Sequence, residues 1–169
     1  NPASSESNRA RACVELVGCT GRVRASFSDT WSRALFAVSC YGMDIDVVAR
    51  NCRDDLTNTA YGYGVDIGSA SRLCRVKAIG TNCRHVVTSS LYTPMYDGYV
   101  GAPRNILVHA SLGHDCASTA FDTHPAAYNW TFSDCHVAHQ NEGDATSQFQ
   151  RYAFLNRGAN TTYRNCSLA

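Results

Sequence analysis

Nine cysteines in a chain of 169 residues constrain the fold more than any other feature of this sequence. Zinc sites bring cysteines together in close pairs such as C-x2-C, and no C-x2-C occurs here. Disulfide bonds are the alternative, and they form in oxidising compartments outside the cytosol. The spacing therefore predicts a secreted protein held together by disulfides, with no metal and no cofactor. The predicted bridging residues are Cys13, Cys19, Cys40, Cys52, Cys74, Cys83, Cys116 and Cys135.

An odd number of cysteines cannot pair completely within one chain. Cys166 lies close to the C-terminus, where chain ends fray, so we expect it to be a free thiol or to pair with another molecule. Cys116 and Cys135 then form the expected bridge of the second half, because they enclose a short loop. The six cysteines between residues 13 and 83 allow many pairings, and the sequence does not choose among them.

Three N-x-[ST] sequons also indicate secretion, and they make Asn129, Asn160 and Asn165 candidates for glycosylation. The chain contains no signal peptide and no apolar run long enough to cross a membrane, so we expect a mature, soluble form. The net charge of +1 provides no strong attraction to nucleic acid or to anionic lipid. We therefore expect a monomer whose partner is another protein.

One helix and a series of strands are predicted. The helix spans residues 29–41, because Trp31, Leu35 and Val38 share one helical face and Gly42 suits a C-terminal cap. Later segments alternate apolar and polar residues with period two or are rich in aromatic and β-branched residues, which predicts strands. These segments are 44–50, 61–67, 74–78, 85–92, 106–110, 128–132, 148–155 and 161–166.

The cysteine distribution divides the predicted elements into two domains. Six cysteines precede residue 84 and three follow it. We predict an α+β protein with a flexible tail at residues 1–12 and a disulfide-rich domain at 13–86, in which the helix packs on a small antiparallel sheet. Short strands separated by turn residues then predict an all-β sandwich at 87–169.

No complete active site is recognisable, so no catalytic residue is assigned. Three tyrosines in a Pro/Gly-rich segment, Tyr92, Tyr96 and Tyr99, lie near Arg104, and such exposed aromatics are typical of glycan or protein contact sites. We interpret these four residues as a partner-binding patch. A hydrolase or nuclease using His109, His114 or His136 is an alternative, because general acid–base catalysis often employs histidine.

The predicted layout resembles the dual-domain effectors that Fusarium and related plant-pathogenic fungi secrete, the secreted-in-xylem type. The matching residues are Cys13, Cys19, Cys40, Cys52, Cys74 and Cys83, with Cys40 on the predicted helix.

This resemblance implies a virulence factor without enzymatic activity that binds a host plant protein. Its expected location is the apoplast or xylem, or the host cell after translocation. Such a factor alters immunity or cell death and is open to recognition by immune receptors. The predicted helix on a sheet also suggests a cystatin-like protease inhibitor, although the Q-x-V-x-G motif is missing.

Overall fold

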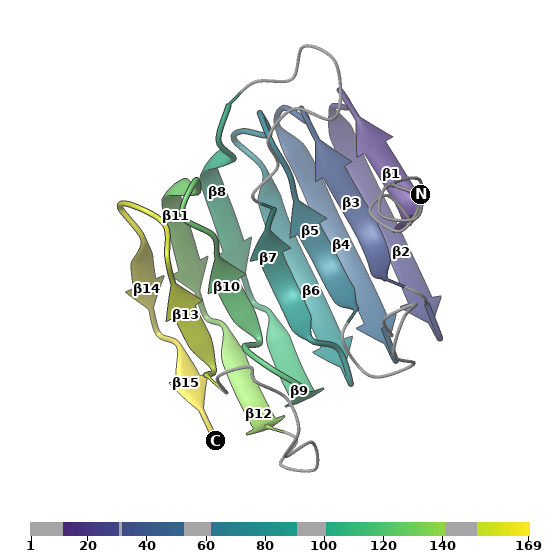
Figure 1. Ribbon diagram of the computed structural model, residues 1–169, viewed down its shortest axis with the longest axis vertical. Helices are drawn as coiled ribbons and strands as arrows, with labels where there is room; N and C mark the ends of the chain where they lie inside the picture. Colours follow the sequence, from purple (N-terminus) through teal and green to yellow (C-terminus); the bar gives the residue numbers. More distant parts are fainter. Residues whose placement is uncertain (1–11, 31, 53–61, 91–100, 141–151) are drawn as a thin grey trace, which may run out of the picture.

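Two parallel β-sheets make up the protein in a computed structural model that describes residues 12–30, 32–52, 62–90, 101–140 and 152–169 (Figure 1). Sheet A contains β1 (Ala12–Val17), β3 (Arg33–Val38), β5 (Tyr63–Ile67), β7 (His85–Ser89), β10 (Phe121–Thr123) and β13 (Phe154–Asn156). Sheet B contains β2 (Gly21–Ser28), β4 (Met43–Arg50), β6 (Arg75–Thr81), β8 (Arg104–His109), β9 (Leu112–Cys116), β11 (Tyr128–Ser133), β12 (His136–Gln140), β14 (Thr162–Arg164) and β15 (Ser167–Leu168).

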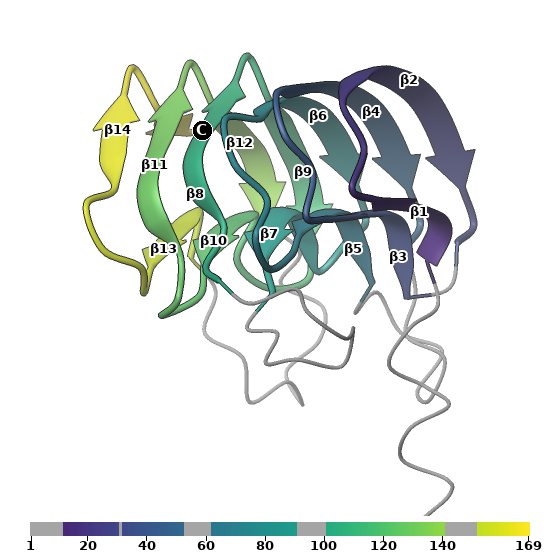
Figure 2. The same ribbon diagram turned by 90° about the horizontal axis from the view of Figure 1, so that it is seen from above.

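The chain alternates between the two sheets, so that the described residues wind into a parallel β-solenoid (Figure 2). Each coil adds one strand to sheet A and then one strand, or two short strands in line, to sheet B. After strand β6 each coil contributes two strands to sheet B instead of one, and β6 accordingly pairs with β4 on one side and with both β8 and β9 on the other. Each coil therefore contacts mainly the coils before and after it, as in other solenoids.

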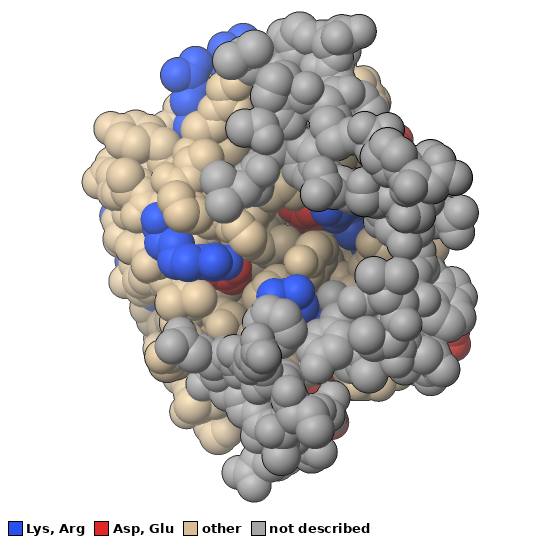
Figure 3. Space-filling view, viewed as in Figure 1, with Lys and Arg blue, Asp and Glu red and all other residues tan. Residues whose placement is uncertain are grey.

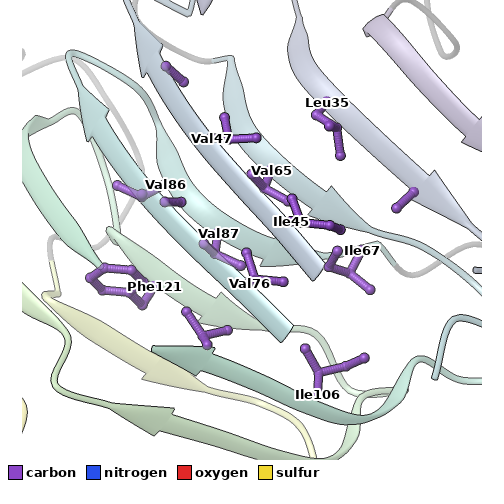
Figure 4. Packing of buried hydrophobic residues seen from close by; sticks show 14 of the residues in the cluster. Leu35, Ile45, Val47, Val65, Ile67, Val76, Val86, Val87, Ile106 and Phe121 are labelled. Atoms are coloured by element: carbon purple, nitrogen blue, oxygen red, sulfur yellow. The ribbon is translucent and has the colours of Figure 1, made fainter. Parts of the chain in front are cut away.

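The core lies between the two sheets and is built from vertical stacks of apolar side chains (Figure 4). Leu35, Val65, Val87 and Phe121 occupy equivalent positions on successive strands of sheet A. Ile45, Val76, Val108 and Phe132 do the same on sheet B. These eight side chains are fully buried, and burying each one stabilises the fold by roughly 1.5–3 kcal/mol.

The corners between strands rely on residues in the left-handed conformation. Asp29, Asn51 and Asn82 each directly follow a strand of sheet B, and Asp115 is the penultimate residue of β9; the φ angles of the four residues lie between 50° and 54°. Asn and Asp tolerate this conformation better than other residues with a side chain. Their side chains also stack: Asn51 Nδ2 donates to Asp29 Oδ1 at 3.0 Å, and Asn82 Nδ2 donates to Asn51 Oδ1 at 3.0 Å.

The predicted helix at residues 29–41 is wrong, and the described residues contain no helix. Arg33–Val38 is strand β3, and every residue of it is buried. Positive φ angles at Asp29, Ser32 and Ser39, between 53° and 67°, interrupt any helical path through this segment. A strand buried on both faces has no period-two alternation, so the spacing of its apolar residues imitated a helical face.

The α+β class and its small antiparallel sheet are also wrong, because the described part contains no helix and every strand pair in it is parallel. The sandwich expected at 87–169 is matched only coarsely, by the two β-sheets that face each other across the core. The expected boundary between residues 86 and 87 falls inside β7, and both sheets continue across it. Most strand predictions themselves are confirmed, notably 44–50, 74–78 and 128–132. Residues 1–11 of the expected tail lie outside the described residues, and Ala12 begins β1.

Candidate functional site

Charged side chains gather on the outer face of sheet A, near the middle of the surface seen in Figure 3. Asp66 and Thr88 are register partners, and Asp122 continues the row on β10 because Phe121 pairs with Val87. Each of the three directly follows a residue of the core stack, so its side chain points to the opposite face of the sheet. The row thus carries two carboxylates on alternate strands.

Arg33 and Ser90 hold Asp66. Arg33 Nε lies 2.6 Å from Asp66 Oδ2, Ser90 donates a short hydrogen bond to the same oxygen, and the Arg33 guanidinium also lies over the Phe36 ring at 4.7 Å. The Asp66 side chain has no exposed surface, and its other oxygen accepts no hydrogen bond. Burial therefore raises the pKa of Asp66, although Arg33 and Ser90 act in the opposite direction.

Asp122 is held more strongly. Arg157 donates two hydrogen bonds to its carboxylate, and His124 Nε2 lies 3.2 Å from Oδ2. Burial alone raises the pKa of Asp122, but the hydrogen bonds from His124 and Arg157 outweigh it and lower the pKa below its usual value. Asp122 is therefore an ionised carboxylate whose oxygens are already occupied.

His85 lies beside the same carboxylate, with its Nε2 atom 3.9 Å from Asp122 Oδ2. Its Nδ1 atom makes a short contact with the carbonyl oxygen of Thr119, and its ring stacks on Tyr63 with centroids 5.2 Å apart. Burial lowers the pKa of His85 to about 4, so the ring is neutral near pH 7. Because both carboxylates lack exposed surface, a substrate has no access to them, and the network serves the stability of the solenoid.

A second cluster lies at the edge of the solenoid, where the chain passes from sheet A to sheet B, and it is exposed. Tyr41, Arg72, Arg104 and Tyr128 occupy equivalent positions on four successive coils, linked by parallel bridges from each residue to the next. Both tyrosines are about half exposed, at 49% and 51%, and both arginines are exposed. We call these four residues the edge ladder.

The edge ladder borders a cavity of about 290 Å³. Its lining combines the two arginines and Tyr128 with small residues, namely Ala70, Arg72, Gly101, Ala102, Arg104 and Tyr128. The Arg72 guanidinium lies over the Tyr41 ring at 5.2 Å. Within the described part of the chain, neither Arg72 nor Arg104 forms an ion pair with a carboxylate, so both guanidinium groups remain available to an anionic ligand.

The strand pairing explains why these side chains line up. The Arg72 backbone N–H donates to the Cys40 carbonyl at 2.8 Å, and the Arg104 N–H donates to the Ser71 carbonyl at 3.0 Å. Such bonds fix successive coils about 4.8 Å apart, so side chains at equivalent positions form a straight row.

The predicted partner-binding patch overlaps this edge through Arg104. Tyr92, Tyr96 and Tyr99 lie outside the described residues. The sequence reasoning did not single out Arg72, Tyr41 or the exposed position of Tyr128. Their equivalence follows from strand register, for which the sequence offered no local signal.

The three candidate catalytic histidines lie on sheet B. His109 ends β8, His114 lies in β9 and His136 begins β12. His114 Nδ1 contacts Asp115 Oδ2 at 2.8 Å, and His136 Nδ1 contacts Ser167 Oγ at 2.9 Å. Burial, with the nearby Arg75, lowers the pKa of His109. The structure shows no contact that joins two of these three histidines, and the residues it describes include no metal-binding group of His, Cys, Asp or Glu.

The glycosylation candidates form ladders like those at the other corners. Asn160 Nδ2 donates to Asn129 Oδ1 at 3.0 Å, and Asn129 Nδ2 donates to Asn105 Oδ1 at 2.6 Å. Asn165 Nδ2 donates to Asp134 Oδ1 at 2.6 Å. The nitrogen that a glycan would modify is therefore a hydrogen-bond donor between coils in all three sequons, while glycosylation itself stays a prediction.

All nine cysteines are thiols in the structure, and six of them are buried. Cys116 and Cys135, the pair expected from sequence, lie in different places: Cys116 ends β9, whereas Cys135 lies between β11 and β12. Cys166 lies between β14 and β15, the equivalent position one coil further on. Disulfide formation itself stays a prediction.

No family model, curated protein or solved structure matches this chain. Kinship with the Fusarium effectors therefore stays a prediction, and the helix-on-sheet domain that it implied is absent from the described residues. Among those residues no helix is long and apolar enough to span a lipid bilayer.

Proposed function

We propose that this protein binds an extended acidic polysaccharide along the edge ladder. The observation that carries the proposal is the exposed row Tyr41, Arg72, Arg104 and Tyr128, which extends over four coils beside a cavity of about 290 Å³. Four coils place the first and last residues roughly 14 Å apart. This length suits several sugar units of a chain lying parallel to the solenoid axis.

The chemistry of the row matches such a ligand. Guanidinium groups bind carboxylate and sulfate with paired, charge-assisted hydrogen bonds. Tyrosine offers an apolar ring face for packing against a sugar and a hydroxyl for hydrogen bonding. Two cations between two aromatic rings thus favour a polymer that carries both anionic groups and apolar faces. The proposal assigns binding without turnover.

The test is equilibrium binding of the purified protein to polygalacturonate, with neutral dextran as the comparison polymer. Changing Arg72→Ala together with Arg104→Ala removes two charge-assisted contacts, each contributing about 1.5–3 kcal/mol, and should weaken binding by about 100-fold or more. Raising the salt concentration should weaken wild-type binding in the same direction, because salt screens charge pairs at the surface.

The matched control is Arg22→Ala with Arg24→Ala, which removes the same charge from the outer face of sheet B, where each arginine pairs with an aspartate outside the edge ladder. Its affinity should stay within about two-fold of wild type. Equal affinity of the two double variants, or equal binding of dextran and polygalacturonate, would contradict the proposal.

The second candidate is the function expected from sequence, a secreted effector that binds a host plant protein. It is favoured by the position of Arg104, which belongs to the predicted patch and lines the cavity. Recovery of a plant protein by wild type but not by the Arg72/Arg104 variant, without polysaccharide binding, would support this candidate over the first. Secretion and location in the apoplast, in the xylem or inside host cells stay predictions.

A further inference from the structure

The cysteines recur at one kind of position, the inward-facing residue directly after a left-handed corner. Eight of the nine follow a residue with positive φ. The corner residues and their cysteines are Gly18 and Cys19, Ser39 and Cys40, Asn51 and Cys52, Leu73 and Cys74, Asn82 and Cys83, Asp115 and Cys116, Asp134 and Cys135, and Asn165 and Cys166.

Backbone hydrogen bonds place three pairs of these corners on neighbouring coils. Gly18 donates to the Val38 carbonyl, Asn51 to the Thr81 carbonyl and Asp134 to the Arg164 carbonyl, at 2.9–3.0 Å. Each of these bonds aligns one corner with the next, so that the cysteines after them stand above one another. Neighbouring parallel strands lie about 4.8 Å apart, and a disulfide bridges Cα atoms about 4.4–6.8 Å apart.

The thiols themselves point along these stacks. The Cys40 thiol contacts the Leu16 carbonyl at 3.4 Å, the Cys83 thiol the Ala49 carbonyl at 3.7 Å, and the Cys166 thiol the Phe132 carbonyl at 3.5 Å. In each case the acceptor lies three residues before the cysteine of the preceding coil. The Cys52 and Cys83 thiols lie close enough to shift each other's pKa, and Cys166 adds to the effect of burial in raising the pKa of Cys135.

We infer that oxidation joins Cys19 to Cys40, Cys52 to Cys83 and Cys135 to Cys166, and that each bridge links two consecutive coils. Glutathione disulfide is a sufficient oxidant. For each bridge, two thiols lose two electrons and two protons and one S–S bond forms, while the S–S bond of one glutathione disulfide is reduced to two glutathione thiols.

Three cysteines remain reduced in this scheme. Cys116 stacks beyond Cys83, which is already bonded to Cys52, and Cys13 and Cys74 have no cysteine at the equivalent position of a neighbouring coil in the described residues. The inference replaces both expectations drawn from sequence, a bridge between Cys116 and Cys135 and a free thiol at Cys166.

Peptide mapping of the full chain tests this pairing directly. The protein is equilibrated with a mixture of reduced and oxidised glutathione, blocked with an alkylating reagent and digested with trypsin without reduction. The expected cross-linked tryptic peptides are 12–22 with 34–50, 51–53 with 78–84, and 105–151 with 165–169. Chymotrypsin, which cleaves after Leu16 and between Cys116 and Cys135, then shows whether Cys13 or Cys19 holds Cys40 and whether Cys116 or Cys135 holds Cys166.

A linkage between 78–84 and 105–151, an internal bridge within 105–151, or alkylation of all nine thiols would overturn the inference. Two variants provide an independent measurement: Cys83→Ser removes a bridge, whereas Cys74→Ser changes an equally buried thiol that has none. In oxidised protein, the melting temperature of the Cys83→Ser variant should lie about 5 °C or more below that of the Cys74→Ser variant. A reductant should abolish this difference. A difference that persists after reduction would contradict the Cys52–Cys83 bridge.

Discussion

The outer faces of the two sheets carry the same kind of ion pair in opposite surroundings. On sheet B, Arg22 pairs with Asp44 at 2.8 Å and Arg24 with Asp46 at 3.1 Å, and both arginine side chains are more than two-thirds exposed. On sheet A, Arg33 is 11% exposed and its partner Asp66 has no exposed surface. The separations differ little, so burial decides what each pair contributes.

Removing one partner of an ion pair therefore has unequal consequences on the two faces. Water solvates an arginine or aspartate left alone on sheet B, and exposed pairs contribute at most about 1 kcal/mol. A carboxylate left alone on sheet A stays buried without a counter-charge, which costs several kcal/mol. Sheet A therefore depends on its pairs far more than sheet B does.

Arg33→Ala should destabilise the protein most, because it leaves Asp66 buried without its cation. We expect the free energy of unfolding to fall by about 3–5 kcal/mol, measured by urea denaturation at pH 7. Arg22→Ala is the matched control from sheet B, with an expected loss of about 0.5 kcal/mol or less.

A double variant separates charge from shape. Arg33→Met with Asp66→Leu removes both charges while keeping much of the volume, so it should recover most of the stability that Arg33→Ala loses. Similar losses for Arg33→Ala and Arg22→Ala would show that burial does not distinguish the two faces.

Stability should also depend on pH, because sheet A buries His85. Its pKa falls from 6.5 to about 4 on folding, so between these values the unfolded chain binds a proton that the folded protein does not. Stability is therefore full above pH 6.5 and declines as the pH drops towards 4, by up to ~3 kcal/mol. Urea midpoints measured from pH 7 to pH 4 follow this loss.

Asp66 and Asp122 also affect how stability depends on pH in that experiment, and their effects differ in direction from each other. The raised pKa of Asp66 favours the folded state as the pH falls, and the lowered pKa of Asp122 removes stability only below its ordinary range. A His85→Gln variant isolates the histidine, since it should be less stable at pH 7 but lose less between pH 6.5 and 4. Equal slopes for variant and wild type would remove His85 as the cause.

Burial alone does not separate the strands that the sequence predicted from those that it missed, because β7 is buried throughout and was predicted, whereas β1 and β2 each have an exposed face and were not. Ile106 and Val108 alternate with exposed or half-buried neighbours, and β8 was found from that alternation. Strand β3 is buried throughout, and the same reasoning made it a helix. Parallel pairing was also invisible, because consecutive strands belong to different sheets and the segments between equivalent positions differ in length.

The same irregular spacing hid most of the candidate site. Tyr41, Arg72, Arg104 and Tyr128 are separated by 31, 32 and 24 residues, so no fixed repeat connects them. Arg104 was identified because it lies near tyrosines and glycines in sequence. The other members became recognisable only when the register aligned them.

The asparagine ladder at the exposed corners is a third kind of polar contact, neither charged nor buried, and its loss should cost less stability than the loss of a buried pair. Asn129 has φ of 56° and bonds both Asn105 and Asn160 through its side chain. Asn129→Ala loses both bonds and places a less tolerant residue in the left-handed conformation, which should cost about 1–2 kcal/mol in urea denaturation.

A substitution that adds an asparagine to the ladder should have the opposite effect and stabilise the protein. Leu73 occupies the equivalent corner one coil before Asn105, with φ of 56° and a side chain that is 50% exposed. Leu73→Asn extends the ladder and relieves the left-handed leucine, so it should stabilise the protein by about 0.5–1 kcal/mol. A loss of stability in Leu73→Asn would mean that the ladder contributes through local packing instead of through conformation and hydrogen bonding. A gain would mean that the corner ladder contributes more to stability than the exposed pairs of sheet B and less than the buried pairs of sheet A.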